Sequence, residues 1–355
     1  MVSPVNIAGR LIGPSQPCLI VAEAGVNHNG DMAVAHRLID AAVEAGADAV
    51  KFQSFVTEEL ITAEAPKARY QAQTTGTARG QHEMLKALEL TGAQQAELKA
   101  HCDHARILYL CTPYEDTSVE WLDRLQVAAF KVASTDTTNI PFLRCLASKN
   151  RPVILSTGMS TLGEVEQAVT TLRMGGLDKK VVILHCTSEY PAPLEEANLR
   201  AIATLQRVFG CPVGFSDHTS GICASPWAVA VGACVVEKHF TLDRTLAGPD
   251  HRASIEPREF AGLVRAIRDV EAALGDGVKR PMPSELGNKP VMQKSLVVTR
   301  SIRLGETIQP SDLACKRPGF GLAPAWFDRV VGKRAAREIP KDTVLTLSCV
   351  DWDGS

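Results

Sequence analysis

The segment CVVEKHF (residues 234–240) carries the strongest evidence for the fold. An apolar run from Ala228 to Val236 reads as the interior of a buried strand, and it ends in Glu237, Lys238 and His239. Because an unpaired buried charge is costly, ionisable side chains at the end of such a strand need partners or a task. Residues two apart on a strand face the same side, so Glu237 and His239 share a face that Lys238 does not. The segment predicts the last strand of a barrel whose tip carries part of a functional site.

Seven similar runs precede this segment. Each is short and apolar, ends in polar residues and is followed by a stretch with helical periodicity. The eight runs are CLIVAEAG (18–25), AVKFQSF (49–55), LYLCTP (108–113), AAFKVAS (128–134), PVILSTG (152–158), VVILHC (181–186), PVGFSD (212–217) and CVVEKHF (234–240). Eight alternations within about 275 residues predict the α/β class and a (β/α)8 TIM barrel. A doubly wound open sheet is the competing architecture, but no GxGxxG follows the first strand.

The segments between the runs show apolar residues at spacings of three and four. Predicted helices are 32–47, 92–105, 117–125, 161–176, 198–210 and, after the last strand, 258–275. Thr161 and Glu164 form a plausible capping box. The long polar connection between Phe55 and Leu108 is either a lid above the barrel mouth or a surface excursion with its own short helix.

The chain changes character after the last predicted helix. GDGVKRPMPSELGNKP (275–290) has the Gly and Pro density of a linker. Beyond it, SLVVTRSI (295–302) and DTVLTLS (342–348) look like short strands separated by turns. We therefore predict a TIM-barrel catalytic domain over 1–278, a linker over 279–292 and a small, mostly β domain over 293–355.

Composition excludes several classes of protein. The formal net charge of −2 at pH 7 gives no electrostatic footprint for nucleic acid or an anionic membrane. The ten cysteines are scattered without a CxxC pair, as expected for a reducing compartment. No apolar stretch approaches the roughly 18 residues that span a bilayer, and the N-terminal residues lack signal-peptide character. We expect a cytoplasmic protein with neither nucleic acid nor membrane as partner.

Polar side chains gather at the predicted strand ends, where TIM barrels build their active sites. These residues are Glu23, Lys51, Gln53, Thr112, Lys131, Ser134, Ser156, His185, Ser216, His218, Glu237 and His239. Any one of them could be a rim residue that bonds to a loop. Together they predict a functional site, because a barrel needs no lysine or histidine there for stability.

Two histidines and two lysines suggest the chemistry. His218 and His239 end neighbouring strands, which lie about 4.8 Å apart, so they can share one divalent metal ion acting as a Lewis acid. Lysines and hydroxyls around one mouth imply an anionic substrate with phosphate or carboxylate groups. A lysine there also raises a Schiff-base aldolase, for which Lys131 is a better candidate than the outward-facing Lys238. Four histidines on helical or inserted segments are assigned no role: His36, His82, His101 and His104.

Eight motifs together resemble the sialic acid synthase family, which includes N-acetylneuraminate, legionaminate and pseudaminate synthases. They are VAEAGVNHNGD (21–31), AVKFQSF, KVASTDTTNIPFL (131–143), ILSTGMS (154–160), LHCTSEYPAP (184–193), GFSDHTSG (214–221), EKHFTLDRTLAGPDHRASIEP (237–257) and KRPGFG (316–321). The resemblance covers nearly the whole chain, and the tail is similar to the family's antifreeze-like (SAF) domain. It implies condensation of phosphoenolpyruvate with N-acetylmannosamine or a related mannosamine-type sugar and water, giving a nine-carbon 2-keto acid and phosphate.

The resemblance also implies roles for individual residues. The implied phosphoenolpyruvate ligands are Lys51, Thr112, Lys131, Ser134, Ser156, Ser188 and Ser216. The implied sugar contacts are Gln53, Tyr190, Asp250 and Arg317. His218 and His239 would bind a divalent metal, manganese first and magnesium or cobalt as alternatives. Glu23, Glu237 and Lys51 match residues needed for turnover, with one of the two glutamates positioning the attacking water or moving its proton.

Three further expectations come from the resemblance. Arg317, in RPG, would reach the sugar's acyl group from a partner subunit in a domain-swapped homodimer. Tyr114 stands where the family commonly has Phe, and Ser188, followed by Glu189, stands where some members have Asn. The sugar could be N-acetylmannosamine or a 6-deoxy diacetamido analogue, with or without a 6-phosphate.

Two other functions stay open at this point. One is the Schiff-base sugar or pyruvate aldolase, and the other is a non-catalytic homologue associated with polysaccharide. All proposed ligands and lysines are present, which argues against a homologue that has lost turnover.

Overall fold

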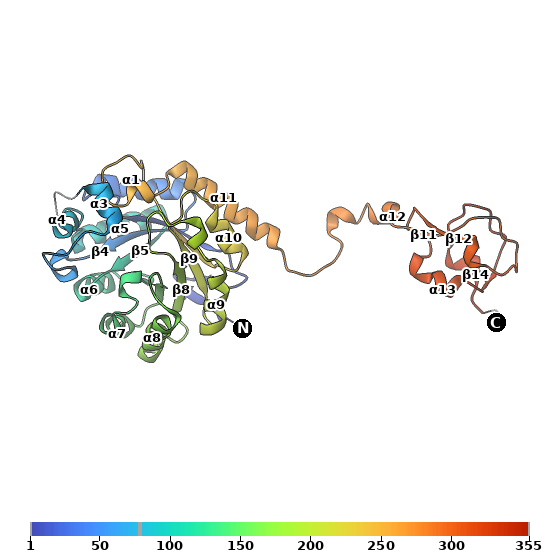
Figure 1. Cartoon of the computed structure of the whole chain (residues 1–355), viewed down its shortest axis with the longest axis horizontal. Helices are drawn as coiled ribbons and strands as arrows, with labels where there is room; N and C mark the ends of the chain where they lie inside the picture. The colour runs from blue at the N-terminus through green and yellow to red at the C-terminus, as the bar shows by residue number, and fades with distance from the viewer. Residues whose placement is uncertain (1, 77–79, 354–355) are drawn as a thin grey trace. The chain divides into compact units, whose positions relative to one another are not determined.

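The computed structural model describes residues 2–76 and 80–353, and the chain divides into two compact units between Gly275 and Asp276. The first unit contains a closed barrel of eight parallel strands in the order β10-β3-β4-β5-β6-β7-β8-β9 (Figure 1). The strands are β3 (Leu19–Gly25), β4 (Ala49–Ser54), β5 (Leu108–Pro113), β6 (Phe130–Val132), β7 (Val153–Ser156), β8 (Val181–Cys186), β9 (Val213–Asp217) and β10 (Val235–His239). The predicted (β/α)8 fold is confirmed, with β10 pairing to β3 to close the ring.

Helices follow the strands and surround them (Figure 1). They are α1 (Met32–Glu44), α5 (Gly92–Ala105), α6 (Asp116–Arg124), α7 (Ile140–Ser148), α8 (Leu162–Leu172), α9 (Arg200–Phe209), α10 (Ala224–Ala230) and α11 (Pro257–Leu274). The predicted capping box opens α8: the Glu164 amide donates to the Thr161 hydroxyl, and the Thr161 amide donates back to the Glu164 carboxylate. Each helix turns an apolar face to the strands, which forms the outer layer of the core.

One sequence interpretation was wrong in its extent. The apolar run from Ala228 to Val236 is not a single strand, because its first residues complete α10 and the strand begins only at Val235. Gly232, at φ +108°, makes the turn between them in a backbone conformation that side-chain-bearing residues rarely adopt. Helix and strand are both buried here, so hydrophobicity alone could not separate them.

The amino-terminal end of the barrel is closed by a hairpin that the sequence did not predict. Strand β1 (Val5–Ile7) pairs antiparallel with β2 (Arg10–Ile12). Val5, Ile7 and Ile12 are buried against the residues that begin the barrel strands. This apolar plug leaves the opposite end, at the carboxyl ends of the strands, as the place for a polar site.

The long connection after β4 forms three short helices, α2 (Thr57–Leu60), α3 (Arg69–Thr75) and α4 (Gln81–Lys86). Met84 of α4 packs with Val26 and Phe55, which follow the first two barrel strands. The insertion therefore lies at the carboxyl end of the barrel. Its action as a moving lid stays a prediction.

The second unit begins with exposed linker residues that include a 3-10 turn (Pro283–Glu285) and α12 (Lys289–Met292). Its small core surrounds two two-stranded sheets, β11 (Ser295–Val298) with β12 (Leu313–Lys316) and β13 (Arg334–Ala335) with β14 (Val350–Asp351), next to α13 (Phe327–Val330). The predicted strand over 342–348 is wrong: Val344 makes one bridge to Val297, Leu345 is buried, and a 3-10 turn follows. In the part of the chain that the structure describes, no helix is long and apolar enough to cross a membrane.

Candidate active site

A cavity of about 550 Å³ opens at the carboxyl ends of the barrel strands. Every site residue predicted within the first unit lines it: Glu23, Lys51, Gln53, Thr112, Lys131, Ser134, Ser156, Ser188, Tyr190, Ser216, His218, Glu237, His239 and Asp250. For the residues on the strands, the alternation inferred from the sequence is the reason, because it turns every second tip residue into the barrel mouth. Ser134, Ser188, Tyr190 and Asp250 reach the cavity from segments beyond the strands. His185 is the exception among the polar tips, since its Nε2 lies 2.9 Å from the Ala197 carbonyl and its ring stacks on Phe215.

Lys51 sits on the floor of the cavity among acceptors. Its Nζ lies 2.8 Å from Glu23 Oε2, 3.0 Å from Thr112 Oγ1 and 3.6 Å from Glu237 Oε2. Burial alone lowers the pKa of Lys51, but Glu23 and Glu237 more than offset this and the pKa is raised. Lys51 therefore stays a cation with three donors at the centre of the site.

Lys131 forms a second cationic centre beside the first. Its Nζ donates to Ser156 Oγ at 2.7 Å and lies 3.8 Å from Glu237 Oε1. Burial lowers the pKa of Lys131, and the attraction of Glu237 opposes that shift without cancelling it. Two lysines with buried, directed ammonium groups provide a site for the phosphate or carboxylate of an anionic ligand.

The pKa values of the two glutamates on the cavity floor are shifted in opposite directions. Burial raises the pKa of Glu23; Lys51 offsets part of this shift, and repulsion from Glu237 adds to it. Burial also raises the pKa of Glu237, but Lys131, Lys51 and the hydrogen bond from Ser216 outweigh it and hold that pKa below its usual range. Glu237 is therefore the fixed anion, while Glu23 is the carboxyl group that can exchange a proton.

Two hydroxyls that line the cavity, those of Ser134 and Ser188, lie close to the backbone of Gly158. The amide of Gly158 donates to Ser134 Oγ at 3.0 Å, and Ser188 Oγ is buried without a hydrogen-bond partner among residues 2–76 and 80–353. A Cβ at position 158 would lie 2.1 Å from Ser188 Oγ and 2.9 Å from Ser134 Oγ. Only glycine allows the backbone to approach these hydroxyls so closely. The unpartnered hydroxyl of Ser188 is available to bind a ligand oxygen.

The two histidines are held neutral with nitrogen lone pairs available. His218 Nδ1 lies 2.6 Å from the Thr187 carbonyl, which can only accept, so Nδ1 carries the proton and Nε2 is the basic nitrogen. Burial lowers the pKa of His218 to about 4 and that of His239 well below its usual range. The rings are 5.5 Å apart between centroids, and His239 Nδ1 is buried with no partner in the described chain.

This donor set fits the divalent metal that the resemblance implies. Neutral imidazoles are the usual ligands of such ions, and a backbone carbonyl on the second nitrogen is the usual way to orient one. Within residues 2–76 and 80–353 no group of three or more His, Cys, Asp or Glu side chains could hold a metal ion. An ion bound here would have two protein ligands and would keep positions for water and substrate.

One tyrosine packs on both histidines, and a second tyrosine, from the insertion, packs on the first. The Tyr190 ring lies 4.2 Å from His218 and 5.4 Å from His239 between centroids, and Tyr70 of α3 lies 4.9 Å from Tyr190. Asp250 lines the same region, where burial, together with repulsion from Glu23, raises its pKa to about 7. The upper part of the cavity is therefore aromatic and only weakly charged.

The sequence missed part of the cavity wall. Asp136 lines the cavity just beyond the tip of β6, and its place in the motif KVASTDTTN, directly after a strand with a polar tip, is the sequence feature that points to it. Tyr70, Gln71 and Met84 come from the insertion, whose sequence gave no sign of which side chains face inward. Tyr114, noted only as a departure from the family, also lines the cavity.

Arg317 belongs to the second unit, where its side chain is exposed. Nothing in the structure of either unit tests its predicted contact with the sugar. That contact, and the domain-swapped dimer that it requires, stay predictions.

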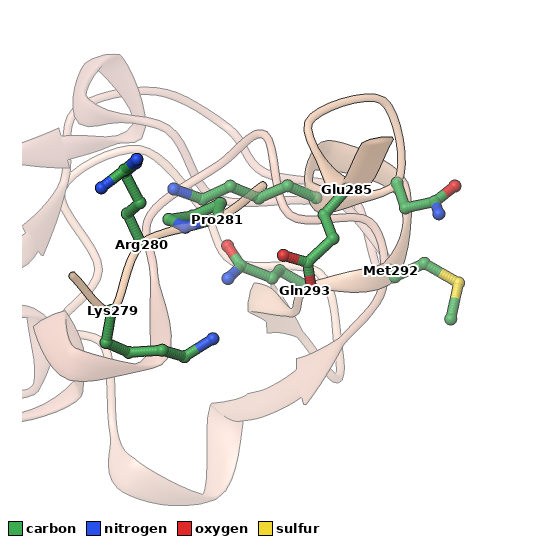
Figure 2. A pocket seen from close by; sticks show the side chains of 8 residues that line it. Lys279, Arg280, Pro281, Glu285, Met292 and Gln293 are labelled. Carbon is green, nitrogen blue, oxygen red and sulfur yellow. The ribbon is translucent and has the colours of Figure 1, made fainter. Parts of the chain in front are cut away.

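A second hollow of about 460 Å³ lies along the linker (Figure 2). It is lined by Lys279, Arg280, Pro281, Glu285, Asn288, Lys289, Met292 and Gln293, all of them exposed. Figure 2 shows the Lys279 and Arg280 side chains pointing in different directions. Since water reaches every wall and no buried charges converge, it lacks the features of the barrel cavity that support catalysis.

Comparison with known proteins gives the same family for the whole chain. The NeuB family model matches residues 38–279, and the SAF domain model matches residues 293–351. An N,N'-diacetyllegionaminic acid synthase from Campylobacter jejuni is 44% identical over 328 residues, which cover 92% of this chain and 98% of that protein. The human N-acetylneuraminate-9-phosphate synthase is 37% identical over 350 residues, which cover 98% of this chain and 96% of that protein.

A solved structure agrees with these relatives. The N-acetylneuraminic acid synthetase from Leptospira borgpetersenii, in complex with citrate, superimposes with a TM-score of 0.71 at 35% identity, covering 81% of this chain and 95% of that one. The resemblance read from eight motifs is thereby confirmed. The chain belongs to the NeuB family and carries a carboxyl-terminal SAF domain.

Proposed function

We propose that this enzyme condenses phosphoenolpyruvate with an N-acetylated mannosamine-type sugar and water to give a nine-carbon 2-keto acid and phosphate. The proposal rests on one observation: a single cavity is lined by two lysines, two neutral histidines and two glutamates whose pKa values are shifted in opposite directions. Relatives named as synthases of legionaminic and neuraminic acids support it.

Phosphoenolpyruvate binds on the cavity floor in this proposal. Lys51 and Lys131 take its anionic groups, and the hydroxyls of Thr112, Ser134, Ser156, Ser188 and Ser216 complete the set. Ser188 has an unused hydroxyl, and Ser156 already orients Lys131. Charge-assisted hydrogen bonds from such groups are about twice as strong as neutral ones, and they fix the direction of the reacting alkene.

His218 and His239 hold the divalent ion, for which we propose manganese. When bound, such an ion polarises the aldehyde oxygen of the open-chain sugar as a Lewis acid. The two imidazoles contribute neutral, oriented donors to it, and the low pKa values of their rings keep protons from competing.

The bond changes follow from this arrangement. C3 of phosphoenolpyruvate uses its C2=C3 electron pair to bond to the aldehyde carbon of the sugar, which leaves C2 electron-deficient and the aldehyde oxygen as an alkoxide. Water then adds at C2, and the proton that it gives up passes to the alkoxide, which becomes a hydroxyl. The C2–O bond to phosphate finally breaks, the new C2 hydroxyl loses its proton to the departing phosphate, and the 2-keto acid remains. Glu23, with its raised pKa, takes the proton of the water, while Glu237 stays ionised and fixes both lysines.

The sugar occupies the upper part of the cavity in this proposal, in contact with Gln53, Tyr190 and Asp250. Gln53 is already oriented by its hydrogen bond to Glu23 at 3.1 Å. Leu60, Ile61, Met84 and Leu85 add an apolar wall from the insertion. Apolar surface suits methyl groups, so we propose the 6-deoxy diacetamido sugar of the legionaminate branch ahead of N-acetylmannosamine.

Arg317 enters the proposal through a second copy of the chain. We propose a cytoplasmic, domain-swapped homodimer in which this arginine reaches the acyl group of the sugar bound by the partner. Its exposure in its own unit leaves it available for that contact. Truncation after residue 285 should abolish sugar saturation; a fully active truncated monomer would refute the swap.

Phosphate release from phosphoenolpyruvate and manganese, measured against a panel of mannosamine derivatives, tests the proposed function. We expect release only with an acetamido sugar and the highest kcat/KM with the diacetamido analogue. The Schiff-base aldolase predicts different behaviour, namely borohydride trapping of Lys131 with pyruvate and indifference to EDTA. This control is needed because the lowered pKa of Lys131 favours the neutral amine, which is the form of lysine that makes a Schiff base.

A further inference from the structure

An ion pair that faces away from the cavity joins the two strand tips that carry the histidines. Lys238 Nζ lies 3.1 Å from Asp217 Oδ1, and the two side chains are 1% and 0% exposed. Lys238 of β10 and Asp217 of β9 are direct partners in the register of the barrel. Each lies one residue from a histidine in the chain, His239 and His218 respectively, and points to the opposite side of its strand.

The loop after β9 and helix α10 both form hydrogen bonds with this ion pair. Asp217 Oδ1 accepts from the amide of Thr219 at 2.9 Å and from its hydroxyl at 2.7 Å, and Oδ2 accepts from Ser225 of α10 at 2.6 Å. Lys238 donates to the Thr219 carbonyl at 2.5 Å. The segment 217–219, with His218 at its centre, is therefore fixed from both ends by side chains behind the barrel wall.

Such a pair is a poor device for stability alone. Removing two charges from water is costly, and replacing a buried ion pair by apolar residues is often neutral or stabilising. What apolar residues do not supply is direction, because their contacts allow the strand tips to shift relative to each other. The ion pair defines the relative position of β9 and β10 where the two imidazoles must converge.

We infer that Asp217 and Lys238 are positioning residues that set the distance and orientation of His218 and His239 for a shared ligand. The inference rests on the proposed function, because that is where the two histidines are assigned to a divalent metal. Residues that orient metal ligands typically contribute 10- to 100-fold in metal affinity. Asp217 and Lys238 belong to this class, with strand geometry as the connection to the ligands.

The test replaces both charges in the full-length chain, as Asp217→Leu with Lys238→Met. Manganese affinity is measured by titration calorimetry without substrates, and folding by thermal unfolding. We expect a retained unfolding midpoint and a manganese Kd raised about 10- to 100-fold. An unchanged Kd in a folded double variant would overturn the inference and leave the pair a merely structural feature.

Two milder variants keep the test decisive if the double variant does not fold. Asp217→Asn keeps the shape and removes the charge, and Ser225→Ala removes one hydrogen bond to Asp217. Both should raise the manganese Kd, Asp217→Asn by more. Ser54→Ala is the matched control, because Ser54 is a fully buried strand-tip serine bonded to a helix serine, Ser118, at 3.1 Å. Equal Kd values for Ser225→Ala, Asp217→Asn and the control would overturn the inference.

A metal-free measurement separates this inference from the proposed function. In chain labelled with 15N at histidine, the Nδ1 proton of His218, bonded to the Thr187 carbonyl, should give a slowly exchanging signal that His218→Asn removes. The double variant should broaden or lose it without any metal present. Failure of the wild type to bind manganese would refute the proposed metal site alone, whereas an unaltered His218 signal in the double variant would refute the positioning role.

Discussion

The two ends of the barrel are covered in different ways. At the amino-terminal end, the β1–β2 hairpin buries Val5, Ile7 and Ile12 in an apolar plug. At the carboxyl end, the insertion with α2, α3 and α4 covers a cavity of about 550 Å³ whose floor is charged. The plug stabilises the fold by burying apolar side chains. At the other end, burial of charged side chains is unfavourable for folding, but these side chains can bind a ligand. Stability and function should therefore respond separately to substitutions at the two ends.

Removing a histidine from the cavity should lower activity more than any of the other substitutions, with little change in stability. We expect His239→Asn to lower kcat at least ~10³-fold, about 4 kcal/mol of transition-state stabilisation, while the thermal midpoint moves by no more than a few degrees. Steady-state phosphate release measures the loss. His185→Asn is the matched control, because His185 also ends a barrel strand but bonds to the Ala197 carbonyl. Equal activity of the two variants would remove His239 from the site.

Ile7→Ala, at the amino-terminal end of the barrel, should have the opposite effect: it should lower stability and leave activity unchanged. Ile7 is fully buried, so truncation should lower the free energy of unfolding by about 2–5 kcal/mol. kcat and KM should stay at wild-type values at temperatures where the variant is folded. Leu11→Ala, at a residue 43% exposed on the same hairpin, should cost less than about 0.5 kcal/mol. A change in KM with Ile7→Ala would mean that the two ends are not independent.

Asp250 offers a pH-dependent version of the comparison. Its pKa is about 7 in the folded chain against an ordinary 3.8, so the folded state keeps a proton that the unfolded state has released. Stability from this group is therefore lost as pH rises from about 4 to about 7, and the full penalty is present above pH 7. Asp250→Asn should stabilise the chain by about 1–3 kcal/mol at pH 8, with the gain vanishing towards pH 4.

Chemical denaturation of the wild type and Asp250→Asn across that pH range measures this gain. Asp243→Asn serves as the control, because Asp243 is exposed and Thr245 lowers its pKa. A gain for Asp250→Asn that does not depend on pH would show that Asp250 is ionised without penalty. The same variant should raise KM for the sugar, which separates its ligand contact from its effect on folding.

The smallest expected effect concerns the insertion. If it opens and closes over the cavity, limited proteolysis within residues 56–107 should slow several-fold when phosphoenolpyruvate and a sugar analogue are bound. The hairpin at the other end should show no such dependence. Cleavage of the insertion at the same rate with and without ligands would make it a fixed wall.

Much of this architecture could be predicted because barrel strands have a simple pattern. Apolar runs with polar tips fixed the strand count, and the alternation at Glu237, Lys238 and His239 correctly separated the cavity side from the helix side. The partner of Lys238 was not foreseen. Asp217 lies in another motif, and only the register of β9 and β10 brings the two together.

The features that could not be predicted from the sequence depend on tertiary packing. The hairpin over residues 5–12 has too few residues for a periodicity to emerge, and its burial depends on the open end of the barrel. The division of the run 228–236 between α10 and β10 depended on a turn at Gly232. The inward side chains of the insertion, such as Tyr70, depended on Tyr190 from a distant loop.

Metal-dependent condensation is tested by measuring both products, phosphate and the keto acid, with enzyme from which a chelator has removed bound metal. With phosphoenolpyruvate and the diacetamido sugar, we predict negligible turnover until manganese is added, and then phosphate and nine-carbon keto acid in equal amounts. The same rate before and after manganese, or phosphate formed without keto acid, would contradict the account.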